Sequence, residues 1–311
     1  MVKRLIVVRP HGFCSGVARA VETAETVLTR YRGETVYCLN EIVHNKQVVS
    51  RLVSLGMVFV SDAAAVPEGA LLLFSAHGVS PAVARQAADR GLRVIDATCP
   101  FVTKVHAEVR RFVSLDADVI CIGHRRHEEV AGVAGEAPDH VRIVENAQEA
   151  EALAIPRGRV VAVVTQTTLG AAQVDAVMAV LLRRFPGLML PSSTDVCYAT
   201  RNRQQAVSAL ARACQRVLVL GSANSSNSQR LVETARAAGA EAALISETSH
   251  LAALDWSAVE TVGLTSGAST PEPFLEEIVS ALHEKHGFSL PEIMTAVEEN
   301  SHVFKLPVLP A

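Results

Sequence analysis

The chain has 311 residues, of which 49% are hydrophobic and 20% are charged, and its formal net charge is −3. This composition excludes a disordered chain, and the nearly neutral charge gives no reason to expect nucleic acid or a membrane as a partner. No apolar run approaches the ~18 residues that a transmembrane helix needs. The short apolar run at the N-terminus meets Arg9 and His11 at once and lacks the features of a signal peptide, so we expect a cytoplasmic protein.

Three segments of the chain repeat one order of elements. In each, a short apolar strand is followed by a polar loop, a helical stretch, a second strand, a third strand and another polar loop. The first strands are expected at 35–39, 118–123 and 216–221, the second at 57–60, 141–144 and 242–245, and the third at 71–74, 160–164 and 261–264. Strands that alternate with helices in this way predict right-handed βαβ units and parallel sheets.

The fold class that follows is α/β, with three repeated modules and mostly parallel sheets. We expect the modules at 1–98, 99–196 and 197–286, and a tail at 287–311 that packs on the first module. Because ligands gather at the carboxyl ends of parallel strands, the polar loops of all three modules are the places to look for a site.

Six cysteines are present, and in a reducing cytosol they are thiols or metal ligands rather than disulfides. Cys38 and Cys121 lie in expected strands and Cys214 lies in an expected helix, so we assign these three to packing.

Cys14, Cys99 and Cys197 share one place in the repeat, because each directly precedes an expected helix. Cys99 follows Cys14 by 85 residues and Cys197 follows Cys99 by 98, close to the 83 and 98 residues between successive repeats. A helix N-terminus stabilises a thiolate. If the modules close round an axis, the three thiolates converge. Such a set favours an iron–sulfur cluster with one open iron, and a structural zinc site is the alternative.

Histidines and hydroxyl groups occupy the polar loops. His44, His77 and His127 stand in equivalent loops, and Glu129, two residues after His127, is suited to hold and deliver a proton. Thr167 and Thr168 are suited to orient a hydroxyl group or to cap the following helix. We expect Glu128 to be a solvated or helix-capping acid. The remaining histidines, apart from His124, are expected at the surface: His11, His106, His140, His250, His283, His286 and His302.

The loop that contains Ser225, Ser226 and Asn227 opens a helix without any large hydrophobic residue, and Ser269 stands in the neighbouring loop. Hydroxyl groups and main-chain N–H groups at such a position bind anions. Neither loop has the pattern of a nucleoside triphosphate site, and no dinucleotide-binding glycine motif is present. A small phosphate or diphosphate group fits this region better.

Nine motifs, in order from Cys14 to Pro271, resemble the 4-hydroxy-3-methylbut-2-enyl diphosphate reductase family. They are GFCSGV, EIVHN, SAHGV, DATCPFVTKVH, IGHRRHEEV, TQTTL, DVCYATRNRQ, GSANSSNS and TSGAST. The resemblance implies a trefoil of three α/β modules around one [4Fe–4S] cluster, held by Cys14, Cys99 and Cys197, with one iron that no cysteine binds. It implies a catalytic group of Glu129, Thr167 and His127. It also implies a substrate-binding group of His44, His77, His127, Thr168, Ser225, Ser226, Asn227 and Ser269.

The activity implied by the resemblance is the reductive dehydroxylation of (E)-4-hydroxy-3-methylbut-2-enyl diphosphate to isopentenyl and dimethylallyl diphosphate. This is the last step of the non-mevalonate route, with ferredoxin or flavodoxin as the expected electron donor. Glu128 and Arg126 depart from the residues usual in the family, proline and glycine, and affect the expected loop shape. A zinc-dependent hydrolase that uses His127 and Glu129, and a cluster-bearing protein without catalysis, are the alternatives.

Overall fold

The computed structural model describes residues 3–299 and 302–310. The chain divides into two compact units. The first comprises Met1–Ala18, His44–Arg51 and Tyr198–Val303, and the second comprises Arg19–Val43, Leu52–Cys197 and Phe304–Ala311. The chain passes between the units within helices α1 (Ser15–Arg30) and α2 (Lys46–Ser54), and also after residues 43, 197 and 303.

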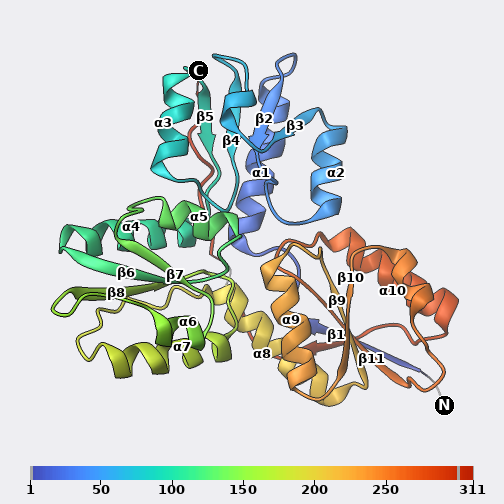
Figure 1. The fold of residues 1–311 in the computed structure, drawn as a ribbon. Coiled ribbons are helices and arrows are strands. Elements are labelled where there is room, and N and C mark those ends of the chain that lie inside the picture. Colours follow the sequence, from blue (N-terminus) through green and yellow to red (C-terminus); the bar gives the residue numbers. More distant parts are fainter. Residues whose placement is uncertain (1–2, 300–301, 311) are drawn as a thin grey trace. The chain divides into compact units, whose positions relative to one another are not determined.

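The first unit is built on a five-stranded sheet in the order β10-β9-β11-β1-β12, in which every pair is parallel (Figure 1). Its strands are β1 (Arg4–Arg9), β9 (Arg216–Leu220), β10 (Glu241–Ile245), β11 (Thr261–Ser266) and β12 (Glu292–Thr295). Its other elements are α8 (Tyr198–Ala213), α9 (Ser226–Ala237), the 3₁₀ helix η2 (Thr248–Ala253) and α10 (Glu272–His286).

Helices cover both faces of the inner strands of this sheet, which explains why residues 5–8 of β1 and 217–220 of β9 are apolar and buried without interruption. The edge strand β12 is mostly exposed. Successive residues of β9 point to opposite faces. Leu218 and Leu220 pack with the apolar side chains of α10, whereas Val217 and Val219 pack with those of α8 and α9.

The second unit contains two further parallel sheets, in the orders β3-β2-β4-β5 and β7-β6-β8. The four-stranded sheet consists of β2 (Val36–Leu39), β3 (Met57–Val60), β4 (Leu71–Phe74) and β5 (Arg93–Asp96), with the 3₁₀ helix η1 (Ala63–Ala65) and helix α3 (Pro81–Asp89). The three-stranded sheet consists of β6 (Ala117–Ile122), β7 (Val141–Val144) and β8 (Val160–Thr165), with α4 (Pro100–Ser114), α5 (Glu128–Ala134), α6 (Ala147–Ala152) and α7 (Ala171–Arg184).

Packing in the three-stranded sheet follows the same alternation as in the first unit. All six residues of β6 are buried. Val119 and Cys121 belong to the apolar cluster under α4 and α5, whereas Ile120 and Ile122 belong to the cluster under α6 and α7.

One strand order occurs in all three sheets. The first strand of each repeat is central, the second lies on one side of it and the third on the other: β3-β2-β4, β7-β6-β8 and β10-β9-β11. The second and third strands of each repeat are therefore added on opposite sides of the first strand. In parallel sheets, this change of side leaves a crevice at the carboxyl ends of the strands, and ligands bind there. The loops there are 40–45 and 75–80, 123–127 and 166–170, and 221–225 and 267–271.

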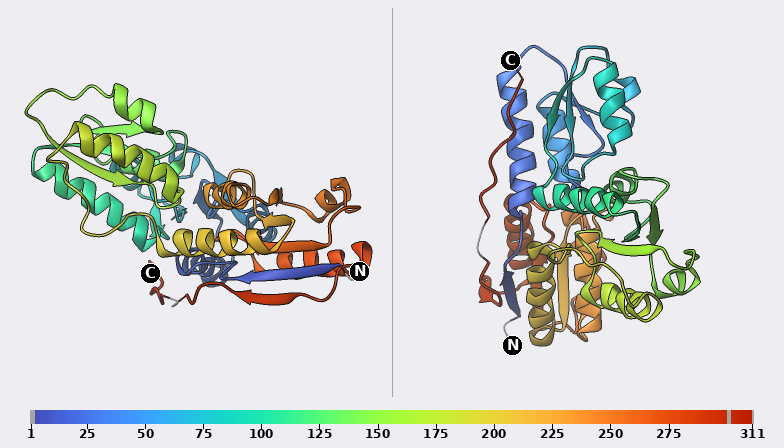
Figure 2. Two further views of the ribbon diagram at one scale, coloured as in Figure 1. Left: turned by 90° about the horizontal axis from the view of Figure 1, so that it is seen from below. Right: turned by 90° about the vertical axis from the view of Figure 1, so that its left-hand side faces the viewer.

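The α/β class, the parallel sheets and the three repeats are confirmed, and the nine repeat strands agree with their expected ranges within two residues. Cys214 is a correction, because α8 ends at Ala213 and this buried cysteine follows the helix. The division into 1–98, 99–196 and 197–286 stays a proposal. β1 pairs with β11, and β12 of the tail pairs with β1; Figure 2 shows β1 and β12 running side by side. An apolar strand pairs with any free sheet edge, and its own sequence does not specify which one.

Candidate functional site

A single main-chain hydrogen bond recurs at three cysteines. The N–H of Cys14 donates to the Ala268 carbonyl (3.2 Å), that of Cys99 to Ala76 (3.0 Å) and that of Cys197 to Thr167 (3.0 Å). In each case the acceptor is the second residue after the third strand of a repeat. The next residue is Ser269, His77 or Thr168, each a polar residue singled out in the sequence. Each cysteine is thus attached to the loop that carries one of these polar side chains.

All three cysteines stand at the start of a helix, as expected. Cys14 directly precedes α1, Cys99 is the N-cap of α4, and Cys197 directly precedes α8. Pro100 takes the first position of α4, where its missing N–H costs nothing. The Val17 N–H lies 3.5 Å from Cys14 Sγ.

Burial separates these cysteines from the other three. Cys14, Cys99 and Cys197 are partly exposed thiols, whereas Cys38, Cys121 and Cys214 are buried. Burial raises the pKa of the Cys38 and Cys121 thiols far above the ordinary value and that of Cys214 to about 11. A cysteine binds a metal as its thiolate, which a helix start or a nearby positive charge stabilises and apolar burial disfavours. The exposed set therefore fits an iron–sulfur cluster, and the buried set fits packing.

The first unit brings the Ser/Asn-rich loop, Ser269 and His44 together. The Ser269 hydroxyl donates to the His44 carbonyl (3.0 Å), and the amide of Asn224 lies 3.4 Å from His44 Nδ1. Asn227 is buried, and its Oδ1 accepts the Ala268 N–H at 2.9 Å. Ser225 is the N-cap of α9. Asn227 thus contacts the loop 267–271, which contains Ser269 and whose Ala268 carbonyl accepts the Cys14 N–H, and Ser226 takes the first position of α9.

Two glycines keep this region closely packed. A Cβ on Gly221 or on Gly267 would lie 2.2 Å from the hydroxyl oxygen of Ser228, which is fully buried. The absence of a side chain at both positions therefore lets α9 approach the ends of β9 and β11.

In the second unit, Glu129 is joined to Thr167 by two hydrogen bonds. The Thr167 N–H donates to Glu129 Oε1 (2.6 Å), and the Thr167 hydroxyl donates to Oε2 (3.0 Å). Glu129 is 2% exposed and Thr167 is 5% exposed. Because the Thr167 carbonyl accepts the Cys197 N–H, one residue connects the buried carboxylate with a candidate cysteine ligand.

Imidazole rings lie beside this pair. His127 is the N-cap of α5 and accepts the Glu129 N–H through Nδ1 at 3.2 Å. The rings of His127 and His77 meet edge to face with centroids 5.7 Å apart. Thr168, in the loop of Thr167, accepts a hydrogen bond from the Gln166 side chain at 2.9 Å. The structure thus gathers His77, His127, Glu129, Thr167 and Thr168 in one unit.

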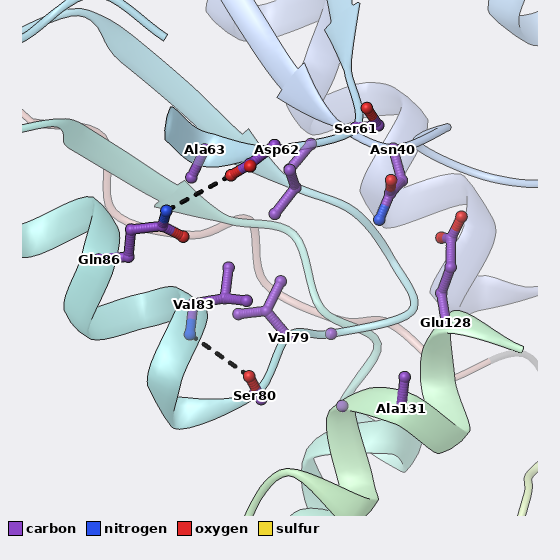
Figure 3. A pocket seen from close by; sticks show the side chains of 13 residues that line it. Asn40, Ser61, Asp62, Ala63, Val79, Ser80, Val83, Gln86, Glu128 and Ala131 are labelled. Atoms are coloured by element: carbon purple, nitrogen blue, oxygen red, sulfur yellow. Dashed lines mark hydrogen bonds between the residues drawn. The ribbon is translucent and has the colours of Figure 1, made fainter. Parts of the chain in front are cut away.

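Glu128 differs from its expected role as a solvated or capping acid. Its Oε2 lies 3.0 Å from His77 Nδ1, with the Glu128 side chain 30% exposed. It also lines a pocket of about 200 Å³, where Figure 3 shows it on the side away from the hydrogen-bonded pair Asp62 and Gln86. Glu128 and Glu129 therefore face different neighbours, and Arg126 is exposed.

The surface assignment of His106 was wrong. This residue is 6% exposed, and its Nδ1 lies 2.6 Å from Glu136 Oε1, which also accepts from Arg110. The sequence held a signal, because His106 follows Val102 by four residues and precedes Val109 by three, on the buried face of α4. His11 is also a correction, with a side chain only 9% exposed; burial is the main reason that its pKa is lowered.

Several residues near the cysteines were not singled out in the sequence. Arg203, 1% exposed, donates to the Gly12 carbonyl at 2.8 Å and pairs with Glu299. Lys104 pairs with Asp195 at 2.8 Å. Each contact joins residues far apart in the chain, which periodicity does not report.

The fold and the site define an α/β protein with partly exposed cysteines at three equivalent helix starts, beside polar loops and a buried carboxylate. The chain belongs to the LytB protein family, whose model matches residues 5–283. The 4-hydroxy-3-methylbut-2-enyl diphosphate reductase of Rhodococcus opacus (strain B4) is 49% identical over 98% of this chain and 90% of its own length. Reductase 2 of Mycobacterium tuberculosis (strain H37Rv) is 48% identical with the same coverage.

Two solved structures are also similar. The E-1-hydroxy-2-methyl-but-2-enyl-4-diphosphate reductase of Plasmodium falciparum has a TM-score of 0.94 at 36% identity, covering 99% of this chain and 96% of its own. An (E)-4-hydroxy-3-methyl-but-2-enyl diphosphate reductase, described as the terminal enzyme of the non-mevalonate pathway, has a TM-score of 0.64 at 31% identity, covering 91% and 100%. Within the described residues, no helix has both the length and the apolarity required to cross a membrane.

Proposed function

We propose that this chain is a 4-hydroxy-3-methylbut-2-enyl diphosphate reductase, which converts its substrate to isopentenyl and dimethylallyl diphosphate in the terminal step of the non-mevalonate pathway. The relatives that carry this name cover nearly the whole chain. The observation that carries the proposal is the double role of Thr167, which holds the buried carboxylate of Glu129 and accepts the N–H of Cys197.

The proposed cofactor is one [4Fe–4S] cluster, with Cys14, Cys99 and Cys197 as its ligands. Their shared place at helix starts and their partial exposure support this assignment, because thiolates at such positions are the ligands that iron–sulfur clusters use. When bound, the cluster supplies electrons one at a time and, at the iron without a cysteine, a Lewis acid for the substrate hydroxyl group.

The reaction consumes two electrons and two protons. The C–O bond of the allylic alcohol breaks, one proton leaves with the oxygen as water, and the other adds to carbon. Glu129 is the proposed proton donor to the departing oxygen. When Glu129 is protonated on Oε2, its proton can pass to the Thr167 hydroxyl 3.0 Å away while that hydroxyl gives up its own. Burial of both residues keeps bulk water from competing.

The diphosphate is the proposed ligand of the remaining polar side chains. His44, Ser225, Ser226, Asn227 and Ser269 stand in the first unit, and His77, His127 and Thr168 stand in the second. Hydroxyl groups, amides and imidazoles at helix starts bind phosphate groups. Binding of the diphosphate fixes the position of the hydroxyl group that reacts. A ferredoxin or flavodoxin as electron donor and a cytoplasmic location stay predictions.

Anaerobic purification followed by metal analysis and an assay tests the proposal. The expected result is a brown protein with about four irons per chain, which forms both products when reduced carrier and substrate are supplied. Colourless protein that contains zinc would support a hydrolase instead. A brown protein that leaves the diphosphate unchanged under reducing conditions would contradict the assigned reaction.

A further inference from the structure

The segment that leads to Cys197 has no helix or strand between Pro191 and Cys197. Ser192, Ser193 and Thr194 are exposed, so apolar packing does not fix them. A thiolate at the end of such a segment needs other contacts to hold its position, because a metal centre requires ligands placed within a few tenths of an ångström.

These contacts come from helix α4, which begins at Cys99. The Lys104 ammonium donates to the Ser193 carbonyl (2.7 Å), the Thr194 carbonyl (3.4 Å) and Asp195 Oδ1 (2.8 Å). All three donors of the ammonium group are therefore directed at this segment.

A second residue of α4 adds to the same contact. Glu108, one helical turn after Lys104, accepts the N–H and the hydroxyl of Ser192 through Oε1, at 3.3 and 2.8 Å. Its other oxygen pairs with Arg111 at 2.6 Å. The i, i+4 spacing places Lys104 and Glu108 on one face of the helix.

Asp195 connects this face with the strand end beside Glu129. Its side chain is 0% exposed, and Oδ2 accepts the N–H of Thr165, the last residue of β8. Two residues later, Thr167 accepts the Cys197 N–H. A buried carboxylate that loses its cation is strongly destabilised. Removal of the Lys104 ammonium would therefore displace Asp195 and, with it, the segment that leads to Cys197.

We propose that Lys104, Glu108 and Asp195 form a clamp that fixes Cys197 relative to Cys99, and that the clamp controls the retention and the potential of the cluster. The role in retention rests on the proposed function; the role in placing Cys197 does not. These are positioning residues, because they act through the two cysteines.

The first test needs no cluster. In the iron-free full-length protein, iodoacetamide labelling of each cysteine is followed by mass spectrometry for the parent, Lys104→Met, Lys104→Arg and Asp195→Asn. We expect Lys104→Met and Asp195→Asn to change the labelling rate of Cys197 severalfold and to leave Cys14 unchanged. Lys104→Arg keeps the positive charge, so its Cys197 should be labelled at a rate close to that of the parent. The control Lys285→Met removes an exposed lysine of α10 and should change neither rate.

The second test uses the anaerobic holoprotein. Loss of outer contacts to metal ligands commonly costs about 10-fold or more in affinity, so we expect iron to leave Lys104→Met about 10-fold faster to a chelator, with a shifted midpoint potential. Unfolding curves identify a variant that has not folded, in which case Asp195→Asn carries the test. Unchanged Cys197 labelling in both variants overturns the clamp. A parent protein without iron overturns the proposed function and the role in retention, while the labelling result still decides the placement of Cys197.

Discussion

Glu129 is the proposed proton donor, and its replacement gives the most direct prediction at the scale of single residues. Glu129→Gln keeps the shape and can still accept the Thr167 N–H, but it has no acidic proton to deliver. Because general acid catalysis contributes about 10²- to 10⁴-fold, we expect turnover to fall by at least about 100-fold. The measurement is product formation under reducing, anaerobic conditions.

Iron content distinguishes this loss from a structural defect. It should remain that of the parent in Glu129→Gln, and the exposed Glu284→Gln of α10 is the matched control. Parent-like turnover in Glu129→Gln would remove this residue from the mechanism.

The cysteines give a second prediction at this scale. Burial raises the pKa of Cys38, Cys121 and Cys214, so these thiols stay neutral and unreactive at mildly alkaline pH. In the iron-free protein we expect iodoacetamide to modify Cys14, Cys99 and Cys197 and to spare the buried three until the chain is denatured. Peptide mass spectrometry measures this order. Modification of Cys121 in the folded protein ahead of Cys99 would contradict the division into two sets.

The sequence was most informative about residues that repeat. The equivalent places of Cys14, Cys99 and Cys197 predicted three helix starts, all of which the structure contains. It was least informative about pairs such as Lys104 with Asp195, because 91 residues separate them. Each lies in one of the quoted motifs, but the motifs do not indicate that the two side chains meet. His106 is an intermediate case. Its spacing from Val102 and Val109 indicates burial, but histidine is usually solvated, and that general preference led to the wrong prediction.

The contact of helix α9 with the strand ends β9 and β11 leads to a prediction at the scale of elements. A Cβ at Gly267 would lie 2.2 Å from Ser228 Oγ but 3.3 Å from Ser228 Cβ. Overpacking of this kind costs about 1–3 kcal/mol. We therefore expect Gly267→Ala to lower the urea midpoint, and the double variant with Ser228→Ala to recover part of the loss.

Gly221 supplies the matched control for this pair. Its Cβ would lie 2.7 Å from Ser228 Cβ as well, so Ser228→Ala should not rescue Gly221→Ala. Equal rescue of both glycine variants would show that the hydroxyl of Ser228 is the obstacle at both positions, and that the 2.7 Å approach to Ser228 Cβ at Gly221 is not. The two double-mutant cycles separate a clash with the hydroxyl from a clash with the backbone position of α9.

Elements were predicted well where pattern alone determines them. Apolar runs such as 57–60, 71–74 and 141–144 agree with the strands of the structure at both ends. The partners of β1 could not be predicted, because burial on both faces makes a strand apolar without indicating its neighbour. The strand β12 is mostly exposed, so it lacks the continuous apolar run by which a buried strand is predicted. The common order of first, second and third strands emerged only in three dimensions.

The whole molecule gives a prediction about metal removal. A group that binds the folded chain and not the unfolded one stabilises the fold. We expect the anaerobic holoprotein to unfold at a higher temperature than the chelated protein, and reconstitution with iron and sulfide to restore the difference. Thermal unfolding followed by circular dichroism is the measurement, and identical midpoints at full iron occupancy would contradict a cluster held by folded residues.

The N–H of each candidate cysteine donates to a main-chain carbonyl, and the residue after that carbonyl is Ser269, His77 or Thr168. Coupling between two bound groups is reciprocal, so a diphosphate that tightens these loops should raise the affinity for iron by the same factor by which iron raises the affinity for the diphosphate. Oxidative damage to the metal centre would then also lower the affinity for the diphosphate substrate. The diphosphate would dissociate from a chain that has lost its iron, and the substrate would remain available to intact copies of the enzyme.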